Sequence, residues 1–196
     1  MQDLASHGYV VIAVDHPPEP PAPRGSGGDP EAREKQLTEL LARDLRFTFD
    51  QVSKKLDGAP DEFRSRLDIT RAGAFGHSRG GRAAVRLCQI DLRLKACVNQ
   101  DGNMAWHPYW RDPSGRPLQQ PFLMLDHLDP DWPGEVYRKM GTTREQYARR
   151  RAERQAEARD QLYATVAGGS YHVTITTPGV SHNSFLDIRL LGRAAK

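Results

Sequence analysis

The chain has 196 residues, of which 38% are hydrophobic, which is enough for one domain with a sizeable core. Its 28 basic and 25 acidic residues leave a net charge of only +3, which argues against a nucleic-acid partner. No apolar run approaches the roughly 18 residues of a membrane-spanning helix, and the N-terminus lacks a basic-then-apolar signal pattern. The sequence as given predicts one cytoplasmic domain, residues 1–196; a missing upstream signal would instead direct secretion.

The first predicted elements are a helix end, a strand and an irregular loop. Residues 2–7 are typical of a helix that stops at Gly8. Residues 9–14 form a continuous apolar run, which predicts a parallel strand buried on both faces. His16 follows this strand at its carboxyl end, so we expect it to line a site. Residues 17–30 hold six of the 14 prolines, which predicts an irregular loop.

From Pro30 a long helix is predicted, because apolar residues recur every three or four positions from Leu37 to Leu56. Residues 69–75 then form a short apolar segment that predicts a strand. The next element, residues 82–88, has a helical composition with no helix breaker. The segment between this strand and this helix carries the strongest signal in the chain.

That segment, residues 76–81, reads Gly-His-Ser-Arg-Gly-Gly and matches the pattern G-x-S-x-G. A strand, a sharp turn and a helix with Ser78 at the turn make a nucleophile elbow. We expect a Cβ at Gly76 or Gly80 to collide with the neighbouring strand or helix. Ser78 then lies at a helix N-terminus, where backbone N–H groups can face an oxyanion. His77 is expected to pack beside the site.

Two more strands are predicted at residues 94–100 and 121–126, on either side of a loop over residues 103–120. The aromatic side chains of that loop are expected to line a substrate pocket: Trp106, Tyr109 and Trp110. Cys88 and Cys97 fall in predicted core elements, so we expect buried free thiols. No Cys, His and Asp spacing indicates a metal site.

A capping box at residues 142–145 predicts a charged helix over about 142–166. This helix carries several arginines but also acidic residues, so we interpret it as a solvated helix rather than a nucleic-acid patch. The last strand is predicted at residues 171–176, and a turn after it carries His182. A closing helix or turn is expected over residues 185–191.

Strands that alternate with helices predict an α/β fold with a mostly parallel sheet, whose sites lie at the carboxyl ends of the strands. A serine nucleophile needs a base, and the base needs a carboxylate that orients it. His182 is the best base, because it follows the last strand, and the order Ser, acid, His is that of the α/β hydrolases. For the acid, strand positions leave three candidates open: Asp101, Asp126 and Asp129.

Four segments appear in an order that resembles a known family: residues 4–11, 76–81, 98–102 and 180–187. Together they resemble the plasma-type platelet-activating factor acetylhydrolases and their bacterial relatives, within the dienelactone-hydrolase-like α/β hydrolases. The resemblance implies an esterase for short or oxidised acyl groups, with no metal or cofactor. It favours Asp101 as the acid over Asp126. Arg79 departs from the apolar residue often found after the nucleophile, but only its backbone N–H is needed for the oxyanion.

The resemblance also implies a strand before Met1 whose loop gives the second oxyanion donor and which lies between the 9–14 strand and the elbow strand. Loss of one such donor typically costs roughly 3–4 kcal/mol of transition-state stabilisation. Three outcomes follow: the 9–14 strand slides against the elbow strand, a second copy of the chain fills the gap, or the natural protein has further residues.

The sequence thus predicts a serine carboxylic ester hydrolase that acts on small-molecule or lipid esters. The alternative is a weak or inactive hydrolase-like fragment with a binding or assembly role, which the absent strands suggest.

Overall fold

Four parallel strands and the helices packed against them make up most of the described chain. The computed structural model describes residues 1–16, 29–58, 60, 65–103, 116–128, 132–163 and 169–186. The helices are α1 (Gln2–Ser6), α2 (Pro30–Asp57), α4 (Arg79–Ile90), α5 (Gly134–Lys139) and α6 (Arg144–Ala158). The strands are β1 (Ala74–His77), β2 (Cys97–Gln100), β3 (Phe122–His127) and β4 (Ser170–Ile175). The described residues also form two short 3-10 turns, η1 (Ile69–Arg71) and η3 (His182–Phe185), and one π-helical turn, η2 (Arg159–Tyr163).

The strands lie in the order β1-β2-β3-β4, and every pair is parallel. In the register, Gln100 of β2 lies beside His77 of β1 and beside Leu125 of β3. The carboxyl ends of all four strands therefore meet at one edge of the sheet. This arrangement confirms the predicted α/β architecture with a parallel sheet.

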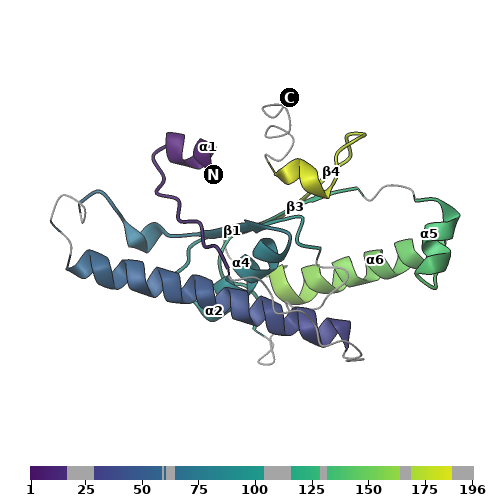
Figure 1. Ribbon diagram of the computed structural model, residues 1–196, viewed down its shortest axis with the longest axis horizontal. Helices are drawn as coiled ribbons and strands as arrows, with labels where there is room; N and C mark the ends of the chain where they lie inside the picture. The colour runs from purple at the N-terminus through teal and green to yellow at the C-terminus, as the bar shows by residue number, and fades with distance from the viewer. Residues whose placement is uncertain are drawn as a thin grey trace.

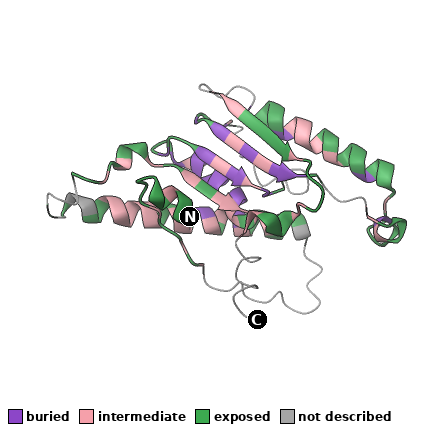
Figure 2. Cartoon of the chain, turned by 90° about the horizontal axis from the view of Figure 1, so that it is seen from above, coloured by how far each residue is buried: buried purple, intermediate pink, exposed green. Residues whose placement is uncertain are grey.

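Helix α4 packs against β1 and β2, and α2 packs against α4, so these helices lie on one side of the sheet (Figure 1). On that side β2 and β3 bury Cys97, Asn99, Phe122 and Met124. The alternating residues on the other face, among them Val98 and Leu123, are only half-buried, and β4 is largely exposed (Figure 2). The core thus lies between the sheet and α4, and both cysteines are buried there as free thiols, as predicted.

Ion pairs join α2 to α4 and to the turn after it. Glu34 of α2 pairs with Arg82, Glu39 pairs with Arg86, and Asp50 pairs with Arg93. In a fourth pair the basic residue lies on α2 and the acidic residue follows α4, since Arg46 faces Asp91. None of the helices in the described ranges is both long and apolar enough to cross a membrane.

The prediction of a strand at residues 9–14 is wrong for this structure. The segment has no regular secondary structure and pairs with no strand, and Tyr9, Val10 and Ile12 are 63%, 65% and 51% exposed. A β-strand needs a neighbouring strand with which to exchange backbone hydrogen bonds. Among the described residues no strand lies beyond β1, so the 9–14 segment has no such neighbour there. The segment therefore does not slide against the elbow strand, which was the first of the three expected outcomes.

Other boundaries shift for local reasons. The predicted strand at 69–75 begins only at Ala74, because the Asp68 carboxylate accepts hydrogen bonds from the backbone N–H and the hydroxyl of Thr70 at 2.9 and 2.6 Å and closes a 3-10 turn instead. The capping box of α6 is formed by Thr143 and Gln146, one residue later than predicted. The 17–28 loop, the loop aromatics Trp106, Tyr109 and Trp110, and the end of the chain after Leu186 lie outside the described residues.

The elbow between β1 and α4 forms as predicted. Ser78 has φ +56° and ψ −120°, a strained conformation for a residue with a side chain. A Cβ on Gly76 would collide with the backbone of Gly80, and a Cβ on Gly81 would lie 2.8 Å from the carbonyl oxygen of Gly76 and collide with the side chain of Asn99. A Cβ on Gly80 would meet nothing within 4 Å, so the expectation for Gly80 is wrong. The turn needs glycine at positions 76 and 81.

This contrast gives a stability test. Gly80→Ala should raise the free energy of unfolding by up to about 1 kcal/mol, because alanine favours a helix and its Cβ has room. Gly81→Ala should lower it by about 1–3 kcal/mol, because the added Cβ forces β1 and α4 apart. Urea unfolding of both variants beside the parent protein measures the two effects. A larger loss for Gly80→Ala would contradict the assignment of the close contact.

Candidate active site

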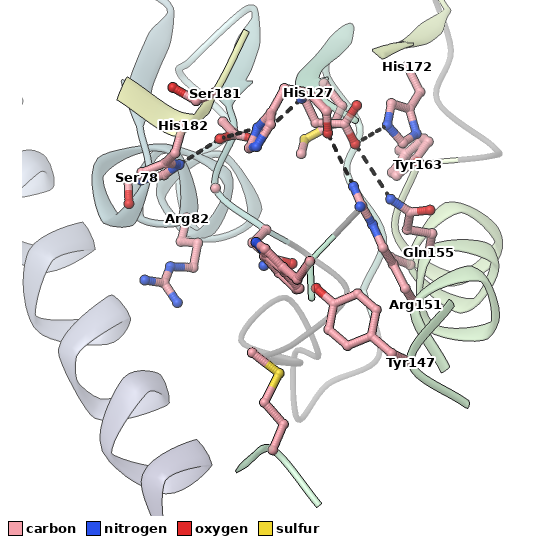
Figure 3. Close-up of a pocket in the computed structure, with 18 residues that line it drawn as sticks. Ser78, Arg82, His127, Tyr147, Arg151, Gln155, Tyr163, His172, Ser181 and His182 are labelled. Carbon is pink, nitrogen blue, oxygen red and sulfur yellow. Dashed lines mark hydrogen bonds and ion pairs between the residues drawn. The ribbon is translucent and has the colours of Figure 1, made fainter. Parts of the chain in front are cut away.

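A cavity of about 610 Å³ opens where the strand ends meet, and Figure 3 shows the side chains around it. Ser78 follows β1, Asp101 follows β2, and His127 ends β3; all three line the cavity together with His182 of η3. Helix α6 and the turn η2 form the opposite wall. The parallel register thus brings the predicted nucleophile, acid and base to one place, although they are far apart in the sequence.

Asp101 and His182 are in direct contact. His182 Nδ1 lies 2.6 Å from Asp101 Oδ2, and Asp101 is 6% exposed. The Asp101 backbone has φ +54°, and its N–H donates to the carbonyl oxygen of Leu125 at 2.6 Å, so β3 fixes the residue's position. Of the three candidate acids, Asp101 is the one that contacts His182 in the structure, while Asp129 lies outside the described residues.

A second imidazole binds the same carboxylate. His127 Nδ1 lies 2.9 Å from Asp101 Oδ2, and the His127 backbone N–H points to Oδ1 at 3.4 Å. Sequence reasoning missed this contact. Neither segment alone carries a signal for it, because it follows from the register that pairs Gln100 with Leu125 and so brings the end of β3 beside Asp101.

Asp126 has a different partner from the one a catalytic acid would need. Its Oδ2 lies 2.8 Å from His172 Nε2 on β4. Burial opposes ionisation of Asp126, but hydrogen bonds from His172 and Thr174 and the charges of His172 and Arg151 outweigh it, and the pKa stays below its ordinary value. Asp126 and His172 therefore form a separate carboxylate–imidazole pair, one strand further from Ser78. Figure 3 shows His172 beside Tyr163, on the side of the cavity that also holds Gln155.

His77, which was also predicted to line the substrate pocket, is not among the cavity residues but holds the loop that carries His182. Its Nε2 donates to the carbonyl oxygen of His182 at 2.9 Å, and the two rings lie 4.4 Å apart. The Phe185 ring stacks on His77 at 6.0 Å. Burial, followed by the charge of His182, lowers the pKa of His77, which favours the neutral ring.

The side chain of Arg79 is held by α2. Its Nη2 lies 2.9 Å from Glu34 Oε1, and Glu34 also pairs with Arg82 at 3.0 Å. The Arg79 backbone therefore lies at the start of α4, while its side chain is bound to α2. His16 is likewise bound to α2, with its Nδ1 2.9 Å from Asp44 Oδ2, and it is not among the cavity residues. Its expected pocket role depended on a 9–14 strand that does not form.

Asn99 is a further residue that sequence reasoning missed. It is fully buried, and its Oδ1 accepts a hydrogen bond from the Gly102 N–H at 2.8 Å. A Cβ on Gly81 or Gly102 would collide with this oxygen. Asn99 therefore fits between the elbow helix and the turn that carries Asp101, and it fixes their separation.

Metal-ligand chemistry is present in one cluster of the described chain. His77, Asp101 and His182 offer ligand atoms within 4.8 Å of one another. Each imidazole already uses one nitrogen in a hydrogen bond, His77 to a backbone carbonyl and His182 to Asp101. These bonds fix the orientation of both rings and do not involve the second nitrogen of either ring, which in His182 is the one that a general base would use.

The chain is similar to several known esterases. No protein-family model matches the chain. A cutinase, est1, from Thermobifida alba is 32% identical over 111 residues, which are 56% of this chain and 30% of the cutinase. Cutinase cut1 from Thermobifida fusca is 30% identical over 95 residues, which are 48% of this chain and 24% of the cutinase. A solved ferulic acid esterase from Streptomyces cinnamoneus aligns with a TM-score of 0.51 at 28% identity, over 87% of this chain and 39% of the esterase.

The chain spans less than a third of the length of these cutinases. The likeness to the solved esterase and the parallel sheet show an α/β-hydrolase-type fold, as predicted. The similar proteins are carboxylic ester hydrolases, which agrees with the predicted class. The likeness to the platelet-activating factor acetylhydrolases stays a prediction.

The position of His77 predicts a pH effect on stability. Its pKa is lower in the folded protein than the ordinary value of 6.5, so below that pH the unfolded chain binds the proton more readily. The free energy of unfolding should fall as the pH decreases from 7.5 to 5.5. His77→Gln, whose amide can still donate to the His182 carbonyl, should show a smaller fall. Denaturant titrations of both proteins at the two pH values measure this, and equal slopes would contradict it.

Proposed function

We propose that the chain is a carboxylic ester hydrolase that acts by acyl transfer to Ser78. The contact between His182 and Asp101, in the same cavity as the strained elbow serine, is the observation that carries the proposal. A serine hydroxyl attacks an ester only when a base takes its proton, and the base acts well only when a carboxylate fixes its tautomer. The esterases similar to this chain support the same chemistry.

In this reaction the Ser78 Oγ attacks the ester carbonyl carbon while His182 Nε2 takes the hydroxyl proton. Asp101 accepts the His182 Nδ1–H and stabilises the imidazolium. The Arg79 backbone N–H stabilises the oxyanion of the tetrahedral intermediate. That intermediate expels the alcohol, which receives the proton from His182. Water, deprotonated by His182, then hydrolyses the acyl-serine and releases the carboxylic acid.

The second candidate is a weak or inactive hydrolase-like fragment with a binding or assembly role. The specific observation that favours it is the unpaired apolar segment at residues 9–14, together with the lack of a described strand beyond β1. An oxyanion with a single donor would lose roughly 3–4 kcal/mol of stabilisation. A second copy of the chain that pairs with β1 is the expected form of such an assembly.

A serine-directed probe separates the two candidates. A fluorophosphonate should label the parent protein and fail to label Ser78→Ala, because only an activated serine reacts. Ser53→Ala is the matched control, because Ser53 lies on α2, which does not line the cavity, and its Oγ donates to the Phe49 carbonyl. The Ser53→Ala variant should be labelled like the parent protein. Absence of Ser78-dependent labelling, together with no hydrolysis of 4-nitrophenyl acetate, would favour the inactive fragment.

The identity of the base is tested by comparing the two histidines that contact Asp101. His182→Gln should slow fluorophosphonate labelling and ester hydrolysis by about 10²–10⁴-fold, as expected for loss of a general base. His127→Gln should slow both by only about tenfold, because His127 contributes one hydrogen bond to the acid. Labelling rates and kcat/KM measure both effects. The reverse ranking would make His127 the base.

A further inference from the structure

Three side chains of the metal-ligand type meet where β1 and β2 end. His77 is the last residue of β1, Asp101 follows β2, and His182 begins η3. One ligand atom from each of them lies within 4.8 Å of the other two. Within the described ranges, no other set of three His, Cys, Asp or Glu side chains comes this close. The proposed reaction uses only Asp101 and His182, and His77 brings a second imidazole to the same place.

Contacts between the three residues hold their side chains together before any ligand arrives. In the register of the sheet, His77 lies beside Gln100, the residue before Asp101. His182 Nδ1 lies 2.6 Å from Asp101 Oδ2, and His77 Nε2 donates to the His182 carbonyl oxygen at 2.9 Å. The centroids of the two imidazole rings are 4.4 Å apart. A metal ion would therefore find its ligands already gathered, which lowers the entropy that binding costs.

Two imidazoles and one carboxylate are a ligand set for Zn²⁺. This ion is commonly held by three protein ligands, two histidines and a carboxylate among them, with water in the fourth position. Mg²⁺ and Ca²⁺ instead prefer six or more oxygen ligands, and this cluster offers a single carboxylate. The donor set therefore selects Zn²⁺ over these two ions.

A small adjustment brings the three ligands to one ion. Tetrahedral bonds of about 2.0–2.1 Å place neighbouring ligand atoms roughly 3.4 Å apart, whereas separations in the cluster reach 4.8 Å. Asp101 is buried, and its N–H donates to the Leu125 carbonyl, so it is the fixed ligand. The His182 side chain is 46% exposed, and η3 contains no buried residue. The His182 ring can therefore turn to close the remaining distance.

An ion at this place would remove the base of the proposed reaction. In the tautomer which that reaction needs, His182 Nδ1 carries the proton that Asp101 accepts, and Nε2 holds the lone pair that takes the Ser78 proton. Coordination through Nε2 occupies this lone pair. Coordination through Nδ1 moves the ring proton to Nε2, which then has no lone pair to offer. Either mode leaves Ser78 without a base.

We infer that His77, Asp101 and His182 form a binding site for Zn²⁺, and that the bound ion inhibits the esterase. The site rests on the positions of the three side chains, whereas the inhibition rests on the proposed function. Zn²⁺ is thus a reversible inhibitor, and its removal restores the contact between Asp101 and His182 that catalysis needs.

The binding test needs no turnover. Calorimetric titration of metal-free Ser78→Ala with zinc chloride should show one ion per chain, and titration with magnesium chloride should show no binding. His77→Gln and His182→Gln, each in that background, should weaken Zn²⁺ binding at least tenfold, since loss of even an outer-shell partner costs about 10–100-fold. No saturable Zn²⁺ binding, or binding that survives either substitution, would overturn the site.

His16→Gln in the same background is the matched control. His16 also pairs with a carboxylate, since its Nδ1 lies 2.9 Å from Asp44 Oδ2, but no third ligand lies beside this pair in the described chain. Its substitution should leave Zn²⁺ binding unchanged. A further measurement avoids substitution of the ligands: in Ser78→Ala, Zn²⁺ should shift the imidazole NMR signals of His77 and His182 and leave those of His16 in place. The opposite pattern would overturn the site.

The inhibition test uses the parent protein. At ten times the measured dissociation constant, Zn²⁺ should slow fluorophosphonate labelling and hydrolysis of 4-nitrophenyl acetate about tenfold, and EDTA should restore both rates. His16→Gln should be inhibited like the parent. An occupied site with undiminished rates would overturn the inhibition. If the parent is neither labelled nor active, while Ser78→Ala binds Zn²⁺ through His77 and His182, the proposed function fails and the zinc site stands.

Discussion

The close approach of β1 and α4 at the elbow is the constraint on which the site depends. Because Gly76 and Gly81 lack side chains, the first turn of α4 lies directly on the end of β1, and Ser78 is forced into its strained conformation. Asn99 then fills the space between this turn and the end of β2, which fixes Asp101 relative to Ser78. The proposed nucleophile Ser78 and the proposed acid Asp101, which follow different strands, are therefore positioned by the same close packing.

The acid in turn organises the imidazoles around it. One carboxylate oxygen of Asp101 meets both His182 and His127, while the next carboxylate along the sheet, Asp126, meets His172. Burial raises the pKa of Asp126, but hydrogen bonds from His172 and Thr174, with smaller contributions from the charges of His172 and Arg151, lower it overall. The same pair of residue types thus occurs twice at one sheet edge, and the Asp101–His182 pair is the one that we propose to act on Ser78.

Elements whose signals lie in neighbouring residues could be predicted from the sequence. Features that depend on contacts with residues far away in the chain could not. The periodicity after Pro30 predicts α2, and the G-x-S-x-G turn predicts the elbow, because both depend on neighbouring residues. The apolar run at residues 9–14 has the composition of a strand, but composition cannot supply a pairing edge. His127 was missed because its contact with Asp101 follows from the register of two strands, which no single segment encodes. The close contact at Gly81, rather than at Gly80, was missed for the same reason, because it is made with Asn99 on another strand, β2.

The ion pairs between α2 and α4 have a consequence for how the chain finds its structure. Glu34, Glu39 and Asp50 meet Arg82, Arg86 and Arg93 in the same order along both segments, and the pair of Arg46 with Asp91 reverses the polarity. A displacement of α2 by one helical turn would place these charges against the wrong partners, a penalty that an apolar interface would impose only weakly. The charged interface therefore favours one register of α2 on α4 over arrangements shifted by a helical turn.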